Sequence, residues 1–171
     1  DIISEKIDQG VRMRIIGDYD IDGVTATYIL LKGFKRLGAN VDTYIPDRIA
    51  DGYGIHDHLI QQAKDDGINL IVTCDNGISA VEQIAFANSL GMTVVVTDHH
   101  EIPFEDTEDG RIYKLPPAAA IINPKQPSCA YPSKNICGAV VAMKLVFALY
   151  ERYGVPEKEK EDYLEPAAIA T

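Results

Sequence analysis

Aspartate and histidine residues follow several apolar runs of this sequence at the point where each run ends. The segment "GDYDIDG" follows one run, "CDNG" follows another, and "VVVTDHH" ends a third. The residues concerned are Asp18, Asp20, Asp22, Asp75, Asp98, His99 and His100. Carboxylates held close together repel strongly unless a cation lies among them. If the runs are neighbouring strands, these residues would form one wall of a metal site.

The ligand types indicate which metal such a site would take. Carboxylates dominate, imidazoles are few, and no set of thiolates accompanies them. This mixture suits Mn²⁺ or Mg²⁺ better than structural zinc. Four or five ligands, some able to bridge, predict two ions about 3.5–4 Å apart, the arrangement used in phosphoryl chemistry.

Each piece also has a simpler interpretation. The pattern D-x-D-x-D-G opens an EF-hand loop, but that loop needs a later Glu and two flanking helices, and the matching position near Leu30 is apolar. Asp75 alone could belong to an ordinary Asp-Asn-Gly turn. His99 and His100 alone could be surface histidines, and Cys74 a small buried residue rather than a nucleophile. A shared location at one sheet edge is what favours the metal site.

Alternation of strand and helix patterns predicts that shared edge. We expect an α/β three-layer sandwich with a mainly parallel sheet of about five strands and helices on both faces. The predicted strands are 11–17, 41–46, 68–74, 92–97 and 118–123. The predicted helices are 23–38, 54–67, 79–91 (capped by Ser79), 136–154 and one beginning at 157. Residues 101–117 and 123–135 are expected to be surface loops.

Ligands of open parallel sheets bind at the carboxyl ends of the strands. Besides the aspartates and histidines, that edge would receive Asp47 and Arg48 after the second strand. Asn123 and Lys125 would follow the fifth strand. The edge therefore combines acidic ligands with a few groups able to contact an anionic substrate.

Composition limits the classes of function. The chain has 171 residues, is 46% hydrophobic and carries a formal net charge of −10, which argues against a broad basic surface for nucleic acid. No apolar run approaches the roughly 20 residues of a membrane span. Three cysteines without a CxxC spacing indicate reduced thiols and a cytoplasmic location.

Several motifs together resemble a known family. "DYDIDG", "TCDNGIS" and "VVVTDHH" are similar to motifs of the DHH phosphoesterase superfamily. "PDRIADGYG", "INPKQPSCAYP" and "CGAVVAMKL" resemble its RecJ-like, single-strand-specific exonucleases. Manganese pyrophosphatases of the superfamily have a His where this chain has Ile16, and this difference favours the RecJ-like branch.

The resemblance implies roles for the residues at matching positions. Asp20 would bind one metal, Asp22 the other, and Asp75 would bridge the two. His99 would be the imidazole ligand. His100 would meet the substrate phosphate.

The remaining site residues have supporting roles by the same resemblance. Asp18 is an expected extra metal ligand, and Asp98 would orient the catalytic site from behind the ligands. Arg48 and Asn123 are expected to contact substrate, with a structural ion pair as the alternative for Arg48.

The implied activity is a two-metal-dependent phosphodiester hydrolase, acting as a 5′–3′ exonuclease on single-stranded DNA in repair and recombination. An activated water would attack phosphorus in line. The resemblance further implies a monomer without membrane association, with partners among replication or repair proteins. The alternatives are a phosphodiesterase for short RNA or cyclic dinucleotides, and a non-catalytic scaffold. A dinucleotide-binding protein is disfavoured, because no G-x-G-x-x-G follows the first strand.

The ends of the chain predict a fragment. It begins at Asp1, and its last helical pattern has no stop signal. We expect residues 1–171 to be a truncated DHH domain. By the resemblance, it would lack an Ala-Asp pair that completes the second metal site and a C-terminal domain of the DHHA1 type. The site sharing Asp22 and His99 would then bind its ion loosely, and the fragment alone would be a weak or inactive nuclease.

Overall fold

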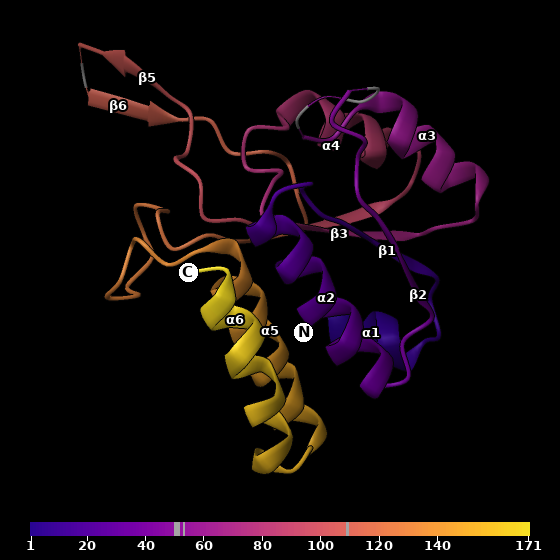
Figure 1. Cartoon of the computed structure of the whole chain (residues 1–171). Helices are drawn as coiled ribbons and strands as arrows, with labels where there is room; N and C mark the ends of the chain where they lie inside the picture. Colours follow the sequence, from indigo (N-terminus) through magenta and orange to yellow (C-terminus); the bar gives the residue numbers. More distant parts are fainter. Residues whose placement is uncertain (50–51, 53, 109) are drawn as a thin grey trace.

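A five-stranded parallel sheet forms the centre of the computed structural model, which describes residues 1–49, 52, 54–108 and 110–171 (Figure 1). The strand order is β2-β1-β3-β4-β7, and every neighbouring pair is parallel. The strands are β1 (Met13–Ile16), β2 (Val41–Tyr44), β3 (Leu70–Cys74), β4 (Thr93–Thr97) and β7 (Ala120–Ile122).

Helices cover both faces of this sheet. One hydrophobic core joins it to α1 (Ile2–Asp8), α2 (Ile21–Arg36), α5 (Gly138–Tyr153), the 3-10 helix η1 (Glu157–Tyr163) and α6 (Leu164–Ile169). A second core joins its other face to α3 (Asp57–Asp65) and α4 (Val81–Ser89). The predicted α/β three-layer sandwich is therefore confirmed.

Side chains of the central strands alternate between the two cores. In β4, Val95 belongs to the first core, whereas Val94 and Val96 belong to the second. Both faces are buried, so the strand reads as a continuous apolar run instead of an alternating one.

Strand order predicts a ligand-binding crevice at the carboxyl end of β1. The chain passes from β1 to β2 on one side, and then returns to β3 on the other side. Such a reversal leaves an opening between the two strands, where ligands of open α/β sheets bind. Asp18 follows β1 and Asp75 follows β3, so both flank this opening.

Helix α5 packs closely against α2. A Cβ atom added to Gly33 of α2 would lie 2.6 Å from a methyl carbon of Val146 in α5. The close contact holds α5 beneath the sheet with its first residue, Gly138, at the carboxyl edge.

The structure differs from the sequence-based expectation in four places. Residues 101–117, expected to be a loop, contain an antiparallel hairpin of β5 (Phe104–Thr107) and β6 (Gly110–Tyr113), which projects from the body (Figure 1). Helix α1 was not predicted. The last predicted helix begins as η1. Ser79 does not cap α4, whose N-cap is Ala80 without a side-chain hydrogen bond.

Ala50, Asp51 and Tyr53 of the predicted "PDRIADGYG" motif lie outside the described residues, as does Asp109. Among the helices that are described, none combines the length and the apolar character needed to cross a membrane.

Candidate metal centre

Two overlapping groups of potential metal ligands lie at the carboxyl edge of the sheet. One contains Asp18, Asp20 and Asp75, and the other contains Asp75, His99 and His100. Within each group, one ligand atom per residue lies within 4.8 Å of the others. Asp75 is common to both groups, as expected of a bridging ligand.

Asp75 has an unusual backbone conformation. Its φ angle is 59°, and no other non-glycine residue in the described part of the chain has a positive φ. This left-handed conformation is uncommon outside glycine and is typically maintained at functional sites. The backbone N–H of Asp75 donates to the carbonyl of Thr97, which ties the end of β3 to the end of β4.

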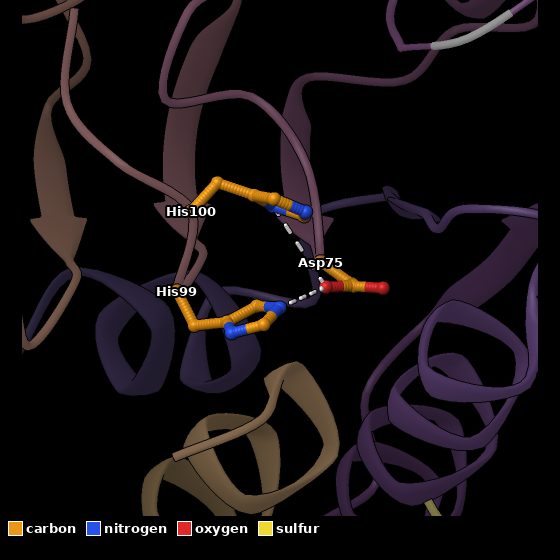
Figure 2. Close-up of side chains that lie close together, drawn as sticks. All are labelled: Asp75, His99 and His100. Atoms are coloured by element: carbon orange, nitrogen blue, oxygen red, sulfur yellow. Dashed lines mark ion pairs between the residues drawn. The ribbon is translucent and has the colours of Figure 1, made fainter. Parts of the chain in front are cut away.

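The carboxylate of Asp75 faces both histidines of the turn after β4. Figure 2 shows His99 and His100 reaching toward it from that turn. Nε2 of His99 lies 3.0 Å from Oδ1 of Asp75, and Nδ1 of His100 lies 4.0 Å from the same oxygen. The two imidazoles, from the turn after β4, thus approach one carboxylate oxygen at the end of the adjacent strand β3.

That oxygen is also a buried acceptor without a hydrogen-bond partner among the described residues. Asp75 is 2% exposed, and its Oδ1 receives no hydrogen bond of normal geometry, despite the proximity of His99. Leaving a buried polar atom unsatisfied costs about 1–3 kcal/mol, and more for a charged group. A cation bound between the two ligand groups would satisfy it, so the residues present fit Mn²⁺ or Mg²⁺.

Burial disfavours the charged forms of the central carboxylates. It raises the pKa of Asp75 to about 6; the neighbouring His99 opposes this shift, and the charge of Asp22 reinforces it. Burial also raises the pKa of Asp18 above its ordinary value. Without a cation, the edge therefore holds negative charge at an energetic cost.

Asp98 organises the turn that carries the two histidines. It is 1% exposed, and its carboxylate accepts hydrogen bonds from the backbone N–H groups of His99, His100 and Ile78 at 2.7, 3.1 and 2.9 Å. Nδ1 of His100 lies 2.7 Å from Oδ1 of Asp98. Burial alone would raise the pKa of Asp98, but these hydrogen bonds outweigh it and hold the pKa below its usual value.

The two histidines gain basicity from different carboxylates. Contact with Asp75 raises the pKa of His99, whereas contact with Asp98 raises the pKa of His100. Their rings lie 4.5 Å apart and are tilted by 50°. Each imidazole thus has a different nearest carboxylate: His99 lies 3.0 Å from Asp75, and His100 lies 2.7 Å from Asp98.

Asp22 is held at the N-terminus of α5. Its two oxygens accept hydrogen bonds from the backbone N–H groups of Gly138 and Ala139, each at 2.7 Å. Oδ2 also lies 3.4 Å from Nε2 of His99. Asp22 therefore borders the predicted site, but it belongs to neither ligand group of the described residues.

Gly138 is a part of the site that the sequence reasoning did not identify. A Cβ atom there would lie 2.7 Å from Oδ1 of Asp75, so only glycine lets α5 approach this carboxylate. The available signal was the glycine of "CGAVVAMKL" at the start of a predicted helix, where glycine is not a favoured helix former.

Asp20 and Asp18 are fixed by the start of α2. Asp20 is the N-cap residue, and its side chain accepts from the N–H of Gly23 at 2.9 Å. Oδ1 of Asp18 accepts from the N–H of Tyr19 at 2.8 Å. A Cβ atom on Gly23 would lie 2.6 Å from that of Asp18, so this glycine is needed for the close approach.

The two predicted substrate contacts lie in different surroundings. Arg48 is exposed, and its guanidinium lies 5.5 Å from the centre of the Tyr19 ring. Tyr19 stands between Asp18 and Asp20 in the sequence. Asn123 is 2% exposed; it donates to the carbonyl of His100 at 3.0 Å and accepts from the N–H of Lys125 at 2.8 Å. Because Asn123 is buried, its position favours a role in holding His100 in place over a direct contact with a substrate.

Cys74 is a buried thiol, as expected. It is 0% exposed, and burial raises its pKa to about 12. A thiol that stays protonated is a poor nucleophile.

Comparison with known proteins identifies similar sequences and structures. A family model described as "DHH family, N-terminal domain" matches residues 12–171. The single-stranded-DNA-specific exonuclease RecJ of Bacillus subtilis is 42% identical over 171 residues, which are 100% of this chain and 20% of that protein. The chain thus spans one fifth of that relative's length.

Two solved structures share the fold. A crystal structure of exonuclease RecJ bound to manganese has a TM-score of 0.84 at 34% identity, covering 99% of this chain and 40% of the other. RecJ of Thermus thermophilus in complex with Mn²⁺ has a TM-score of 0.74 at 31% identity, covering 99% of this chain and 22% of the other.

The separate pairing of the two histidines predicts crossed effects of two substitutions. In the metal-free chain, Asp75→Asn should lower the pKa of His99, because the raising carboxylate is lost. Asp98→Asn should instead lower mainly the pKa of His100. Titration of the imidazole resonances by NMR measures both values. Equal shifts of both histidines in both variants would contradict the separate pairing.

Proposed function

We propose that this chain, which belongs to the DHH family, carries the metal-dependent phosphodiesterase site of a single-stranded-DNA-specific exonuclease. The buried Oδ1 of Asp75, which has no hydrogen-bond partner among the described residues, lies where two groups of potential ligands overlap and is the main support for this site. The relatives of RecJ type, two of them solved with manganese, support the choice of activity and cofactor.

The ligands divide into two sets around Asp75. Asp18 and Asp20 would hold one Mn²⁺ or Mg²⁺ ion together with Asp75, and His99 would hold the other. Asp22, 3.4 Å from His99, is the proposed further carboxylate of that second site. Bound divalent cations would neutralise phosphate charge and lower the pKa of a water near phosphorus.

His100 is the proposed contact to the substrate phosphate. Asp98 fixes the ring through Nδ1 and raises the pKa of His100, so the imidazolium form that attracts a phosphate oxygen is stabilised. Asn123 holds the backbone carbonyl of His100 from the other side. Asp98 and Asn123 therefore act as positioning residues, and Arg48 is a proposed phosphate contact at the rim.

The proposed exonuclease activity requires more than the residues of this chain. We propose that the chain is the N-terminal domain of a longer enzyme that digests single-stranded DNA from its 5′ end, in repair and recombination. A second domain would complete the DNA-binding surface, since a formal net charge of −10 provides little general attraction for a polyanion. Replication or repair proteins remain the proposed partners, and the monomer the proposed state.

A cytoplasmic location is proposed on the basis of the cysteines. Cys74, Cys129 and Cys137 are all free thiols. Unpaired cysteines are typical of reducing compartments.

Metal binding should depend on Asp75 and on pH. Calorimetric titration with Mn²⁺ should show at least about tenfold weaker binding in Asp75→Asn and in His99→Ala. The first variant removes the negative charge of the shared ligand, and the second removes an imidazole ligand. Because the pKa of Asp75 is raised to about 6, protons compete with the cation, and affinity should fall as the pH drops through about 6.

Two matched variants provide controls for the metal titration. Asp106→Asn changes an exposed carboxylate of the hairpin and should bind Mn²⁺ normally. His100→Ala should also retain most of the affinity. Unchanged affinity in Asp75→Asn would contradict the shared-ligand assignment.

Exonuclease activity is the direct test of the proposed function. With saturating Mn²⁺, a version extended to the length of the relatives should release mononucleotides from 5′-labelled single-stranded DNA. His100→Ala in that version should reduce turnover by roughly 10²–10³-fold through loss of a charge-stabilising contact. This chain alone should be weak or inactive.

Three results would argue against parts of this proposal. Equal rates for the short and extended versions would contradict the role of a second domain. A strong preference for short RNA would favour the oligoribonuclease alternative. Absence of hydrolysis despite normal Mn²⁺ binding would favour a non-catalytic scaffold.

A further inference from the structure

Positive charge is concentrated in one segment of an acidic chain. Residues 110–150 contain five Lys or Arg residues and no Asp or Glu. The rest of the chain has eleven Lys or Arg residues against 26 Asp or Glu. The segment includes β6, β7, the loop 123–136 and most of α5, and it reaches the carboxyl edge of the sheet (Figure 1). Three of these five cations are paired with carboxylates: Arg111 with Asp106, Lys114 with Glu105, and Lys125 with Glu101. Lys144 forms no ion pair among the described residues, so its charge remains available to a polyanion.

A pocket of about 260 Å³ lies within this segment, between the end of β7, the loop 123–136 and α5. Its walls are mainly apolar, including Ile122, Ile136 and Val141. Tyr131 and Lys144 also line it, with the Lys144 ammonium 5.0 Å from the centre of the Tyr131 ring. The volume is below the roughly 300–1,000 Å³ of sites for drug-sized ligands, so it suits one small planar group.

Hydrogen bonds hold the walls of this pocket in place. The side-chain amide of Gln126 donates to the carbonyls of Ile121 and Asn123 at 3.1 and 3.3 Å. The ammonium of Lys134 donates to the carbonyls of Pro124 and Cys129 at 2.7 and 2.6 Å. The loop is therefore fixed against the edge strand, and the pocket is formed without a ligand.

Asn123 connects the pocket to the metal centre. It lines the pocket, and its side-chain amide donates to the carbonyl of His100. The carbonyl of Ile122, another lining residue, accepts from the N–H of Asp98. A group in the pocket is thus separated from the DHH turn only by the backbone of β7 and its end.

We propose that this pocket binds a nucleobase of the single strand whose phosphate lies at the metal centre. The inference rests on the proposed function and adds a substrate subsite to it. A base is planar and apolar on its faces, which matches the pocket walls and a stacking partner such as Tyr131. It is joined to phosphates, which the ammonium of Lys144 would attract. No carboxylate lines the pocket among the described residues.

Cys129 gives a reporter inside the pocket. It is a half-buried lining thiol, and Cys137, half-buried at the N-cap of α5 next to Gly138, reports on the metal centre. Both cysteines are alkylated by a maleimide in the presence of Mn²⁺ and a short oligothymidine, and the extent of alkylation is measured by mass spectrometry. A gel checks that the oligothymidine stays intact. The comparison is an abasic oligonucleotide of equal length, which has the phosphates but no bases.

The expected result is protection of Cys129 by oligothymidine and little protection by the abasic strand. Tyr131→Ala and Lys144→Ala should weaken oligothymidine binding roughly fivefold to tenfold. Lys158→Ala, which removes an exposed charge from η1, should leave it unchanged. The affinity of all variants for Mn²⁺ should stay the same.

Three outcomes would overturn the base pocket in distinguishable ways. If both strands bind and protect Cys129 equally, protection does not depend on a base. If both bind and neither protects Cys129, the strand binds elsewhere. In either case the pocket proposal alone fails. If neither strand binds the chain in the presence of Mn²⁺, the pocket proposal fails. The proposed function fails only if the version extended to the length of the relatives also releases no mononucleotides.

Discussion

Repulsion among carboxylates at one edge of a parallel sheet is the constraint around which this structure is organised. Asp75 lies at its centre, 2% exposed, with an oxygen that no hydrogen bond from the described residues satisfies. Asp20 is exposed, but the fold keeps Asp18, Asp22, Asp75 and Asp98 buried and does not relieve their repulsion through contact with water. It surrounds them with backbone N–H donors and two imidazoles. These groups do not neutralise all of the negative charge, so the arrangement is suited to binding a cation.

The packing of α5 reflects the same constraint. Its N-terminal N–H groups bind Asp22, so the positive end of a 16-residue helix dipole faces the acidic edge. Gly138 permits this approach at one end, and the contact of Gly33 with Val146 sets the distance to α2 along the helix. A helix that builds the core therefore also sets the position of Asp22 and borders Asp75.

Local sequence patterns predicted most of the sheet and the potential metal ligands at its carboxyl edge. They did not predict elements that are held in place by contacts between residues far apart in the sequence. Continuous Val and Ile runs identified the buried strands, and the residues after them identified the ligand edge. The seven residues of α1 are too few for a clear helical period, and contacts such as that of Tyr153 with Ser4 hold the helix. The hairpin is exposed along both strands, so it lacks the apolar alternation of a half-buried strand. The bond between Asp22 and Gly138 joins residues 116 positions apart, and no local signal reports it.

The position of a bound cation would show directly whether Asp75 is the shared ligand. Crystals of the chain soaked in Mn²⁺ can be measured near the manganese absorption edge, where anomalous scattering locates the ion. We expect an anomalous peak within coordination distance of Oδ1 of Asp75, with His99 or with Asp18 and Asp20 as the other ligands. An ordered site in which Oδ1 accepts a hydrogen bond from His99, with manganese absent or bound elsewhere, would contradict this expectation.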